Sequence, residues 1–193
     1  SVQLEQGMVV LDAIHRIQVE HANDLAVRWN CKAGKCGSCS MEINGKPKLA
    51  CMTRLSDYGD DELISIQPMK AFPVIKDLVS DVSWNYKQNK KILPFKPGEK
   101  QNGKDRVMYQ QDVERIQEFR KCIECYLCQD VCHVLRDQGQ KEKFVGPRFM
   151  IRLASLEMHP LDVEDRIPQI KAEFGSGMCN ITRCCTEVCP EHI

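Results

Sequence analysis

The chain lacks a net charge and lacks any hydrophobic run long enough to cross a membrane. Its 27 Lys and Arg residues balance 27 Asp and Glu residues, so no long-range field favours nucleic acid or an anionic membrane surface. A membrane span needs about 18 consecutive apolar residues, whereas the apolar runs here, such as residues 8–11, are short. The N-terminus has neither an export signal nor a transit segment. We therefore expect a soluble chain that does not bind nucleic acid.

Cysteine, by contrast, is abundant, with 12 in 193 residues. Three kinds of site use cysteine at this density: a disulfide framework, structural zinc and iron–sulfur clusters. Disulfides are typical of small secreted domains, but this chain shows no export signal and its cysteines bunch at spacings of three and four. Disulfides are therefore the least favoured of the three.

The first part of the chain is predicted to combine one helix with short strands. Val10, Ile14 and Ile17 recur at helical spacing, which predicts a helix over residues 9–20. Asn44-Gly45 is a favoured hairpin turn pair. Strands are expected at residues 25–29, 40–43, 48–53 and 63–66. Together these elements form a small mixed sheet with a helix packed on it.

Helical spacing replaces strand signals further along. Val74, Leu78 and Val82 lie four residues apart and favour a helix. A stretch rich in Lys, Pro and Gly then predicts a solvated linker over residues 88–105.

The last part of the chain is predicted to be entirely helical. Helices are expected before Cys122, from Gly146-Pro147 onwards and over residues 162–174. The fold class is therefore α+β. Its two domains are expected at residues 1–87 and 106–193, joined by the linker.

The first cysteine group has the spacing of a plant-type [2Fe–2S] ferredoxin, C-x4-C-x2-C followed by a distant fourth cysteine. The predicted ligands are Cys31, Cys36, Cys39 and Cys51. Gly34 and Gly37 allow the loop to bend tightly around an inorganic core, and their N–H groups are expected to point at sulfur. Zinc is the alternative, but structural zinc sites usually present two C-x2–4-C knuckles. The hairpin would return Cys51 to the loop.

The second cysteine group has the bacterial ferredoxin spacing C-x2-C-x2-C-x3-C. In two-cluster proteins the fourth cysteine of such a run binds the other cluster, and a second run in the same frame ends at Cys189-Pro190. The predicted [4Fe–4S] ligands are Cys122, Cys125, Cys128 and Cys189.

A third cluster follows from the same reciprocal rule. Its predicted ligands are Cys132, Cys179 and Cys185, and Thr182 occupies the position of the fourth. Three thiolates hold a [3Fe–4S] core, because a fourth iron would lack a strong ligand. Cys184 is left over, either as a buried free thiol or as a residue that completes a [4Fe–4S] site.

The chain resembles the iron–sulfur subunit of succinate dehydrogenase and fumarate reductase, most closely the bacterial members, over nearly its whole length. The resemblance extends beyond the cysteines. The matching stretches are Cys31-Lys-Ala-Gly-Lys-Cys-Gly-Ser-Cys39, Phe72-Pro-Val-Ile-Lys-Asp-Leu-Val79, Phe144-Val-Gly-Pro147 and Cys185-Thr-Glu-Val-Cys-Pro190.

The resemblance implies a β-grasp domain of the plant-type ferredoxin class followed by a helical bacterial-ferredoxin-like domain. Family members carry a further first strand and a C-terminal tail, so a fragment of a longer chain is expected here. The implied function is electron transfer from the FAD of a separate flavoprotein subunit through [2Fe–2S], [4Fe–4S] and [3Fe–4S] clusters to a quinone. The implied partners also include membrane-anchor subunits. The chain would be peripheral, on the cytoplasmic or matrix side, where thiolates stay reduced.

The quinone end departs from the family pattern. His133 stands where a proline follows the fourth cysteine in some members, and Asn180 stands where a histidine occurs in some relatives. His133, Asn180 and Thr182 are candidates for quinone contact, or alternatively for packing and supporting roles. No catalytic constellation of its own is predicted. The competing functions are service to another flavin-dependent reductase and a zinc-stabilised interaction module.

Overall fold

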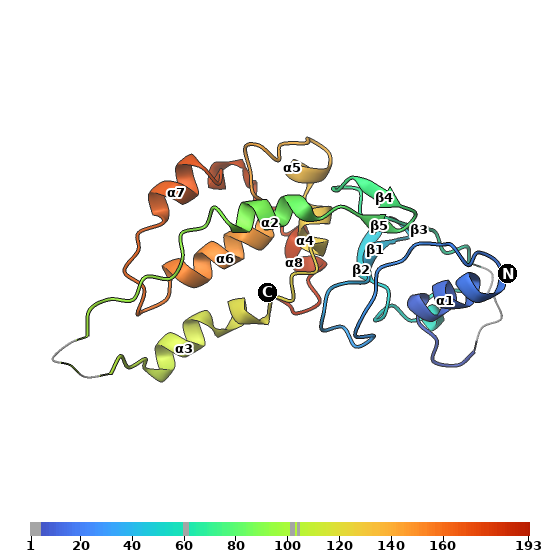
Figure 1. The fold of residues 1–193 in the computed structure, drawn as a ribbon, viewed down its shortest axis with the longest axis horizontal. Helices are drawn as coiled ribbons and strands as arrows, with labels where there is room; N and C mark the ends of the chain where they lie inside the picture. Colours follow the sequence, from blue (N-terminus) through green and yellow to red (C-terminus); the bar gives the residue numbers. More distant parts are fainter. Residues whose placement is uncertain (1–4, 60–61, 101–102, 104) are drawn as a thin grey trace.

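A computed structural model describes residues 5–59, 62–100, 103 and 105–193. It shows a sheet-containing N-terminal half and a helical C-terminal half that lie side by side (Figure 1). The predicted α+β class is therefore confirmed. No helix within the described ranges is long and apolar enough to cross a membrane.

The N-terminal half is built on a three-stranded antiparallel sheet of order β2-β1-β3. Its strands are β1 (Ser40–Ile43), β2 (Lys46–Leu49) and β3 (Ile66–Gln67). Asn44 and Gly45 both adopt positive φ between β1 and β2, which confirms the predicted hairpin. The strand expected at residues 63–66 forms only at its end, as β3.

Helix α1 (Val10–Glu20) covers this sheet, in agreement with the predicted helix. Val10, Leu11 and Ile14 are fully buried against the sheet side chains Met41 and Ile43. Asp12 accepts the Val9 N–H at 3.1 Å and so caps the first turn. The sequence therefore fixes the packed face of α1 through helical spacing alone.

Two predictions about this half were wrong. Residues 25–29 form no strand, because Ala26 N–H bonds to the Asp77 carboxylate (2.8 Å) in place of a neighbouring strand. Val74, Leu78 and Val82 lie on no common helix. The hairpin β4 (Val74–Lys76) and β5 (Val79–Ser80) replaces it, turning at Asp77 with φ +46°. The β-branched residues there favour strand over helix.

The C-terminal half is helical, as predicted, and several of its helices are short. Its elements are α3 (Gln110–Ile116), the 3-10 turn η3 (Gln117–Lys121), α4 (Leu127–Val131), α5 (His133–Arg136), α6 (Pro147–Glu157), α7 (Ile167–Ala172), the 3-10 turn η4 (Ser176–Met178) and α8 (Cys184–Glu187). Pro147 opens α6 at its first position, which confirms that prediction. The helix expected over residues 162–174 is shorter, as α7.

Helix α2 (Ser83–Asn89) follows the N-terminal half but packs into the helical one (Figure 1). The Trp84 ring meets the Phe149 ring edge-on, with centroids 6.2 Å apart. Asn85 is fully buried, and its side-chain oxygen accepts a hydrogen bond from Gln129 in α4 at 3.3 Å. This helix therefore contributes to the core of the second half.

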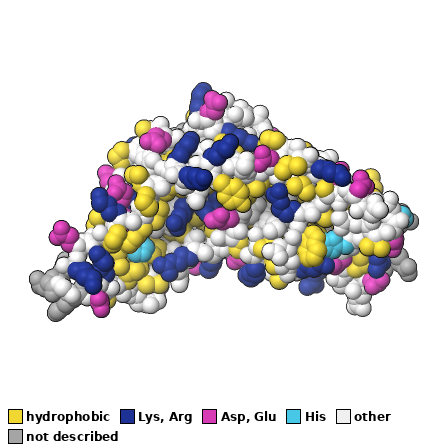
Figure 2. Space-filling model, in the orientation of Figure 1, with side chains coloured by type: hydrophobic (Ala, Val, Ile, Leu, Met, Phe, Trp, Pro, Cys, Tyr) yellow, Lys and Arg dark blue, Asp and Glu magenta, His cyan; other side chains and the backbone are white. Residues whose placement is uncertain are grey.

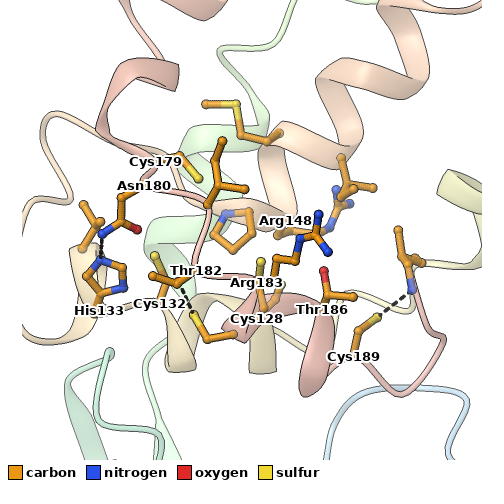
Figure 3. A pocket seen from close by; sticks show the side chains of 18 of the residues that line it. Cys128, Cys132, His133, Arg148, Cys179, Asn180, Thr182, Arg183, Thr186 and Cys189 are labelled. Atoms are coloured by element: carbon orange, nitrogen blue, oxygen red, sulfur yellow. Dashed lines mark hydrogen bonds between the residues drawn. The ribbon is translucent and has the colours of Figure 1, made fainter.

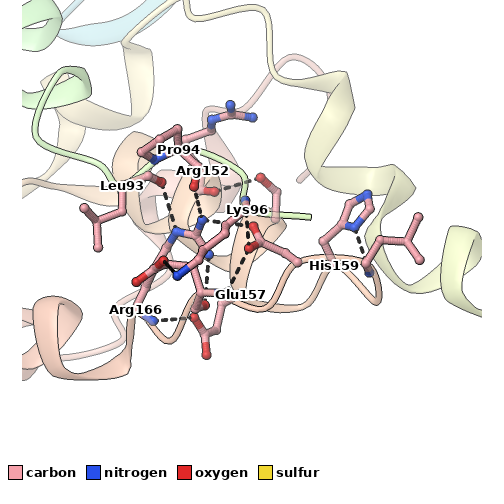
Figure 4. Close-up of polar contacts among 11 residues, drawn as sticks. Leu93, Pro94, Lys96, Arg152, Glu157, His159 and Arg166 are labelled. Carbon is pink, nitrogen blue, oxygen red and sulfur yellow. Dashed lines mark hydrogen bonds and ion pairs between the residues drawn. The ribbon is translucent and has the colours of Figure 1, made fainter. Parts of the chain in front are cut away.

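The segment predicted to be a solvated linker is anchored in part. The Arg166 guanidinium, fully buried, donates to the carbonyl oxygens of Leu93 (3.0 Å) and Pro94 (2.6 Å) and pairs with Asp162 at 2.9 Å (Figure 4). Asp162 also accepts the Lys96 N–H at 3.2 Å. Residues 93–98 therefore belong to the packed surface of the helical half.

Candidate metal centres

The first cysteine group lies on the loop of residues 31–39, which leads directly into β1. Cys31 is exposed, whereas Cys39 and Cys51 are buried. The hairpin returns the chain to the loop as predicted, because the Cys51 N–H donates to Cys39 Sγ at 3.4 Å. All four cysteines of the group are thus held by one loop and one hairpin.

Backbone N–H groups in this loop point at cysteine sulfur. Ala33 and Lys35 both donate to Cys31 Sγ at 3.4 Å, and Ser38 donates to Cys36 Sγ at 3.5 Å. Such donors stabilise negative charge on thiolate sulfur and on a cluster that it ligates. The loop is therefore organised around its sulfurs by the backbone itself.

The two glycines allow the loop to bend, as expected, but their N–H groups do not contact sulfur as predicted. Among the described hydrogen bonds, the donors to Cys31 and Cys36 are the neighbouring residues Ala33, Lys35 and Ser38. Both glycines adopt positive φ, +67° and +68°, a conformation that favours glycine. A Cβ on Gly34 would meet the Met52 side chain, whereas one on Gly37 would meet the backbone of Cys125 in the other half.

Burial and hydrogen bonding divide the thiols of this group. Burial acts to raise the pKa of Cys36, but hydrogen bonds from Ser38 and Cys31 outweigh it and bring that pKa to about 6. Burial raises the pKa of Cys39 to about 12, against a hydrogen bond from the Cys51 N–H. Cys36 therefore favours the thiolate and Cys39 the thiol, until a metal displaces the proton.

The other cysteines surround a cavity of about 300 Å³ in the helical half (Figure 3). It is lined by seven of them: Cys122, Cys128, Cys132, Cys179, Cys184, Cys185 and Cys189. Apolar side chains including Val134, Phe144 and Ile151 complete the wall. Two cysteine runs about sixty residues apart in sequence thus share one apolar cavity.

Short helices bring the two runs together. Helix α4 carries Cys128 in its first turn, and Cys132 follows its last residue. Helix α8 opens with Cys184 and Cys185 and packs on α4. The left-handed residues Tyr126 and Arg183 precede these helices at equivalent places in the two runs. The two runs share their residue spacing, and they therefore also share a left-handed residue at the same position.

The buried thiols raise one another's pKa values within and between the two runs. Burial raises the pKa of Cys125 to about 11, and the nearby Cys122 and Cys189 add to the effect. Burial also raises the pKa of Cys132, with smaller contributions from Cys184 and Cys185. The last cysteine of each run thus lies near cysteines of the other run.

The three candidates for quinone contact all line the cavity. Asn180 Nδ2 lies 3.0 Å from His133 Nε2, so these two side chains form a pair across the two runs. Thr182 Oγ1 lies 3.3 Å from Cys184 Sγ, and that thiol also reaches the Val131 carbonyl oxygen at 3.7 Å. Figure 3 shows His133 and Asn180 together at one end of the cavity. Cys184 faces the position that Thr182 occupies.

The donor set fits polynuclear iron–sulfur clusters better than a single ion. Among the described residues no group of three or more His, Cys, Asp or Glu is arranged to hold one metal ion. The cysteines surround a volume instead of converging on a point, and cysteine sulfur is the ligand that iron–sulfur clusters use. The first loop could hold one cluster and the cavity two.

Two features of the site were missed in the sequence. Arg148 is buried in the cavity wall and forms an ion pair with Glu124. Gly37 touches Cys125 across the two halves. Neither contact has a periodic or motif signature, because each depends on how distant segments pack.

Comparison with known proteins gives one domain match for each half and further matches for the chain as a whole. Residues 1–87 match a 2Fe-2S iron-sulfur cluster binding domain, and residues 118–193 match a 4Fe-4S dicluster domain. The fumarate reductase iron-sulfur subunit of Escherichia coli O6:H1 is 31% identical over 188 residues, which cover 95% of this chain and 75% of that subunit. The chain belongs to the family of fumarate reductase and succinate dehydrogenase iron–sulfur subunits.

Other relatives extend this family assignment. The fumarate reductase iron-sulfur subunit of Mycobacterium tuberculosis is 31% identical over 100% of this chain and 78% of its own length. An uncharacterized iron-sulfur protein of Methanococcus maripaludis is 34% identical, but this chain spans only 37% of its length. A chain of the Mycobacterium smegmatis Sdh1 complex in the apo form superposes with a TM-score of 0.95 at 60% identity, over all of this chain and 81% of that one.

Proposed function

We propose that this chain is the electron-transfer subunit of a succinate:quinone oxidoreductase, the class that includes succinate dehydrogenase and fumarate reductase. Electrons would enter from the FAD of a separate flavoprotein subunit and leave to a membrane quinone. The observation that carries the proposal is the arrangement of two cysteine sites in direct contact: a loop at the surface and an apolar cavity behind it. Family membership supports the choice of partner enzyme.

The chain's own residues hold and insulate the redox groups. Cys31, Cys36, Cys39 and Cys51 would ligate the [2Fe–2S] cluster, and Cys122, Cys125, Cys128 and Cys189 the [4Fe–4S] cluster. When bound, the clusters supply one-electron redox chemistry at potentials set by charge, hydrogen bonds and exposure. The N–H groups of Ala33, Lys35 and Ser38 favour negative charge at the first site. The apolar wall of the cavity excludes water from the other two.

The third cluster would be a [3Fe–4S] cluster held by Cys132, Cys179 and Cys185. Thr182 lines the cavity where a fourth thiolate would be needed, and a hydroxyl is a poor ligand for iron in such clusters. Cys184 Sγ is engaged by Thr182 and by a backbone carbonyl, which supports its assignment as a free thiol.

The quinone would approach the end of the cavity beside the third cluster. The His133–Asn180 pair, 3.0 Å apart, offers polar hydrogens near that end. A quinone oxygen accepts hydrogen bonds, so a paired imidazole and amide can orient it. Membrane-anchor subunits would form the other wall, with this chain attached peripherally on the cytoplasmic side, or the matrix side in mitochondria.

The test is electron paramagnetic resonance at low temperature on the complex purified without oxygen, combined with iron analysis. We expect an oxidised-state [3Fe–4S] signal that disappears on adding succinate, a [2Fe–2S] signal that then appears, and about nine irons per chain. About ten irons and no oxidised-state signal would mean that Cys184 completes a second cubane cluster. Zinc in place of iron, or signals unaffected by succinate, would overturn the proposal.

A further inference from the structure

The two cysteine sites meet at one point of backbone contact. Gly37, in the first loop, faces Cys125, in the first run of the helical half. A Cβ built on Gly37 would lie 2.6 Å from Cys125 Cα, 2.8 Å from its Cβ and 2.9 Å from its backbone nitrogen. Real Cβ atoms do not approach other atoms this closely, so only glycine fits here without moving one loop away from the other.

This contact is part of a continuous core. Cys125 and Leu127 pack in the same buried apolar cluster as Cys39 and Cys51. Cys125 is only 8% exposed. The interface between the two halves is therefore closely packed beside the glycine, and a side chain at Gly37 has no free volume to enter.

An ion pair and a hydrogen bond also join the two halves. Glu42 in β1 is fully buried; one carboxylate oxygen pairs with Arg136 in α5 at 3.0 Å, and the other pairs at 3.1 Å with Lys70 of the same half as Glu42. The Ala71 N–H donates to Asp130 in α4 at 2.9 Å. Because these bonds fix how the halves dock, displacement at Gly37 would open the contact locally instead of sliding the whole interface.

We propose that Gly37 is a positioning residue that sets the separation of the first and second clusters. The inference rests on the proposed function, because it assumes clusters at the predicted ligands. One electron leaves the [2Fe–2S] cluster as the [4Fe–4S] cluster takes it up. Electron tunnelling falls steeply with distance, so a loop pushed outward from Cys125 slows that step. Each of the two touching residues belongs to a segment that carries predicted ligands, so their contact offers a direct protein path between the two clusters.

Gly34 is a matched control in the same loop. Its φ is +67°, against +68° for Gly37, so alanine at either position strains the backbone equally. The three atoms nearest to a Cβ on Gly34 all belong to the Met52 side chain, two of them at 2.9 Å, and Met52 is 58% exposed, so its side chain has room to turn away. The two alanine variants therefore share the strain and differ in the contact between the halves.

The experiment compares Gly37→Ala and Gly34→Ala with the wild type in the intact complex. Iron content and the amplitude of the [2Fe–2S] resonance report cluster loading. Microwave power saturation of that resonance, with the [4Fe–4S] cluster also reduced, reports the magnetic coupling between the two clusters. We expect Gly37→Ala to saturate at several-fold lower power and to transfer electrons from succinate to the later clusters several-fold more slowly. Gly34→Ala shares the backbone strain without the contact at Cys125, so it should change both quantities by a clearly smaller factor.

Loss of the first cluster does not leave the inference untested. Asparagine tolerates positive φ better than alanine, so Gly37→Asn and Gly34→Asn repeat the comparison with less strain. If only the Gly37 variants lose the cluster, the cause is the contact with Cys125, because the Gly34 variants share the backbone strain. Equal coupling, or equal loss, at the two positions would overturn the inference while wild-type signals leave the proposed function standing. A wild type without clusters would overturn both.

Discussion

The two cysteine sites of this molecule are built in different ways. The first is local, since one loop and one hairpin carry all four cysteines, and backbone N–H groups donate to three of the four sulfurs. The second is assembled from two distant runs around an apolar cavity. There, the Ile193 N–H donates to Cys189 Sγ at 3.5 Å, and backbone hydrogen bonds at Cys125, Cys132 and Cys185 do not outweigh burial.

The difference shows how each site manages the charge on its thiolates. Although burial acts to raise it, hydrogen bonds from the Ser38 side chain and from backbone N–H groups of the surface loop bring the pKa of Cys36 to about 6. In the helical half, burial raises the pKa values of Cys125, Cys128, Cys132 and Cys185. Cavity thiolates therefore depend on the positive iron itself, and the fold of that region is coupled to its metal.

The largest expected effect is the loss of a whole cluster from the cavity. Cys185→Ser removes a predicted ligand and should lower the iron content by about three atoms of about nine, while the [2Fe–2S] resonance keeps its amplitude. The adjacent Cys184→Ser is the control and should keep all the iron. The measurement is the iron content of both variants together with their electron paramagnetic resonance spectra. Iron loss from Cys184→Ser alone would contradict the reciprocal ligand assignment.

A second substitution tests how much a buried ion pair stabilises the end of the helical half that lies far from the cysteines. Arg166→Ala leaves the buried Asp162 carboxylate without its ion pair and should cost about 3 kcal/mol of unfolding free energy. Lys96→Ala is matched to it, because the exposed Lys96–Glu164 pair at 3.4 Å is worth at most about 1 kcal/mol. Denaturant unfolding followed by circular dichroism measures both. Similar losses in the two variants would contradict the importance of the buried pair.

Metal removal should separate the two sites by their dynamics. Helices α4 and α8 have five and four residues, too few to be stable alone, and they meet around the cavity. After chelation, their amides should exchange with solvent at least about tenfold faster, equivalent to about 1.4 kcal/mol of local stability. Hydrogen exchange read by mass spectrometry should show little change in β1 and β2. An equal rise of amide exchange in the β1–β2 hairpin would contradict the prediction that the cavity depends on its metal more than the first site does.

The smallest expected change is a single iron atom. Thr182→Cys places a thiolate in the fourth ligand position of the third cluster and should raise the iron content from about nine to about ten per chain. The oxidised-state [3Fe–4S] resonance should disappear in this variant. Thr186→Cys is a control, since Thr186 lines the same cavity outside the ligand frame. An unchanged resonance in Thr182→Cys would mean that position 182 faces away from the cluster.

Sequence patterns within a single segment predicted the elements that depend mainly on interactions within that segment. Apolar spacing located α1, the Asn44-Gly45 pair located the β1–β2 hairpin, and Gly146-Pro147 located the start of α6. The β4–β5 hairpin was mistaken for a helix because three apolar residues happen to lie four apart. Helices α4, α5 and α8 gave no signal, since five residues or fewer are held by tertiary contacts and not by propensity.

The candidate site was predictable where covalent spacing controls it. The interval between cysteines limits which sulfurs can reach a common cluster, and the predicted ligand groups depend on that limit. The Gly37–Cys125 contact and the Arg166–Asp162 pair could not be predicted in this way. Each joins segments whose meeting depends on the packing of the whole molecule.

The position of α2 decides how the chain can be divided for study. Trp84 packs on Phe149, and Asn85 receives a hydrogen bond from Gln129, so α2 belongs to the core of the helical half. A fragment that begins at residue 88 would leave the Phe149 ring and the Gln129 amide uncovered. A fragment that begins at residue 81 retains both partners, together with the segment that Arg166 anchors. Expression of the helical half by itself should therefore start before Ser83.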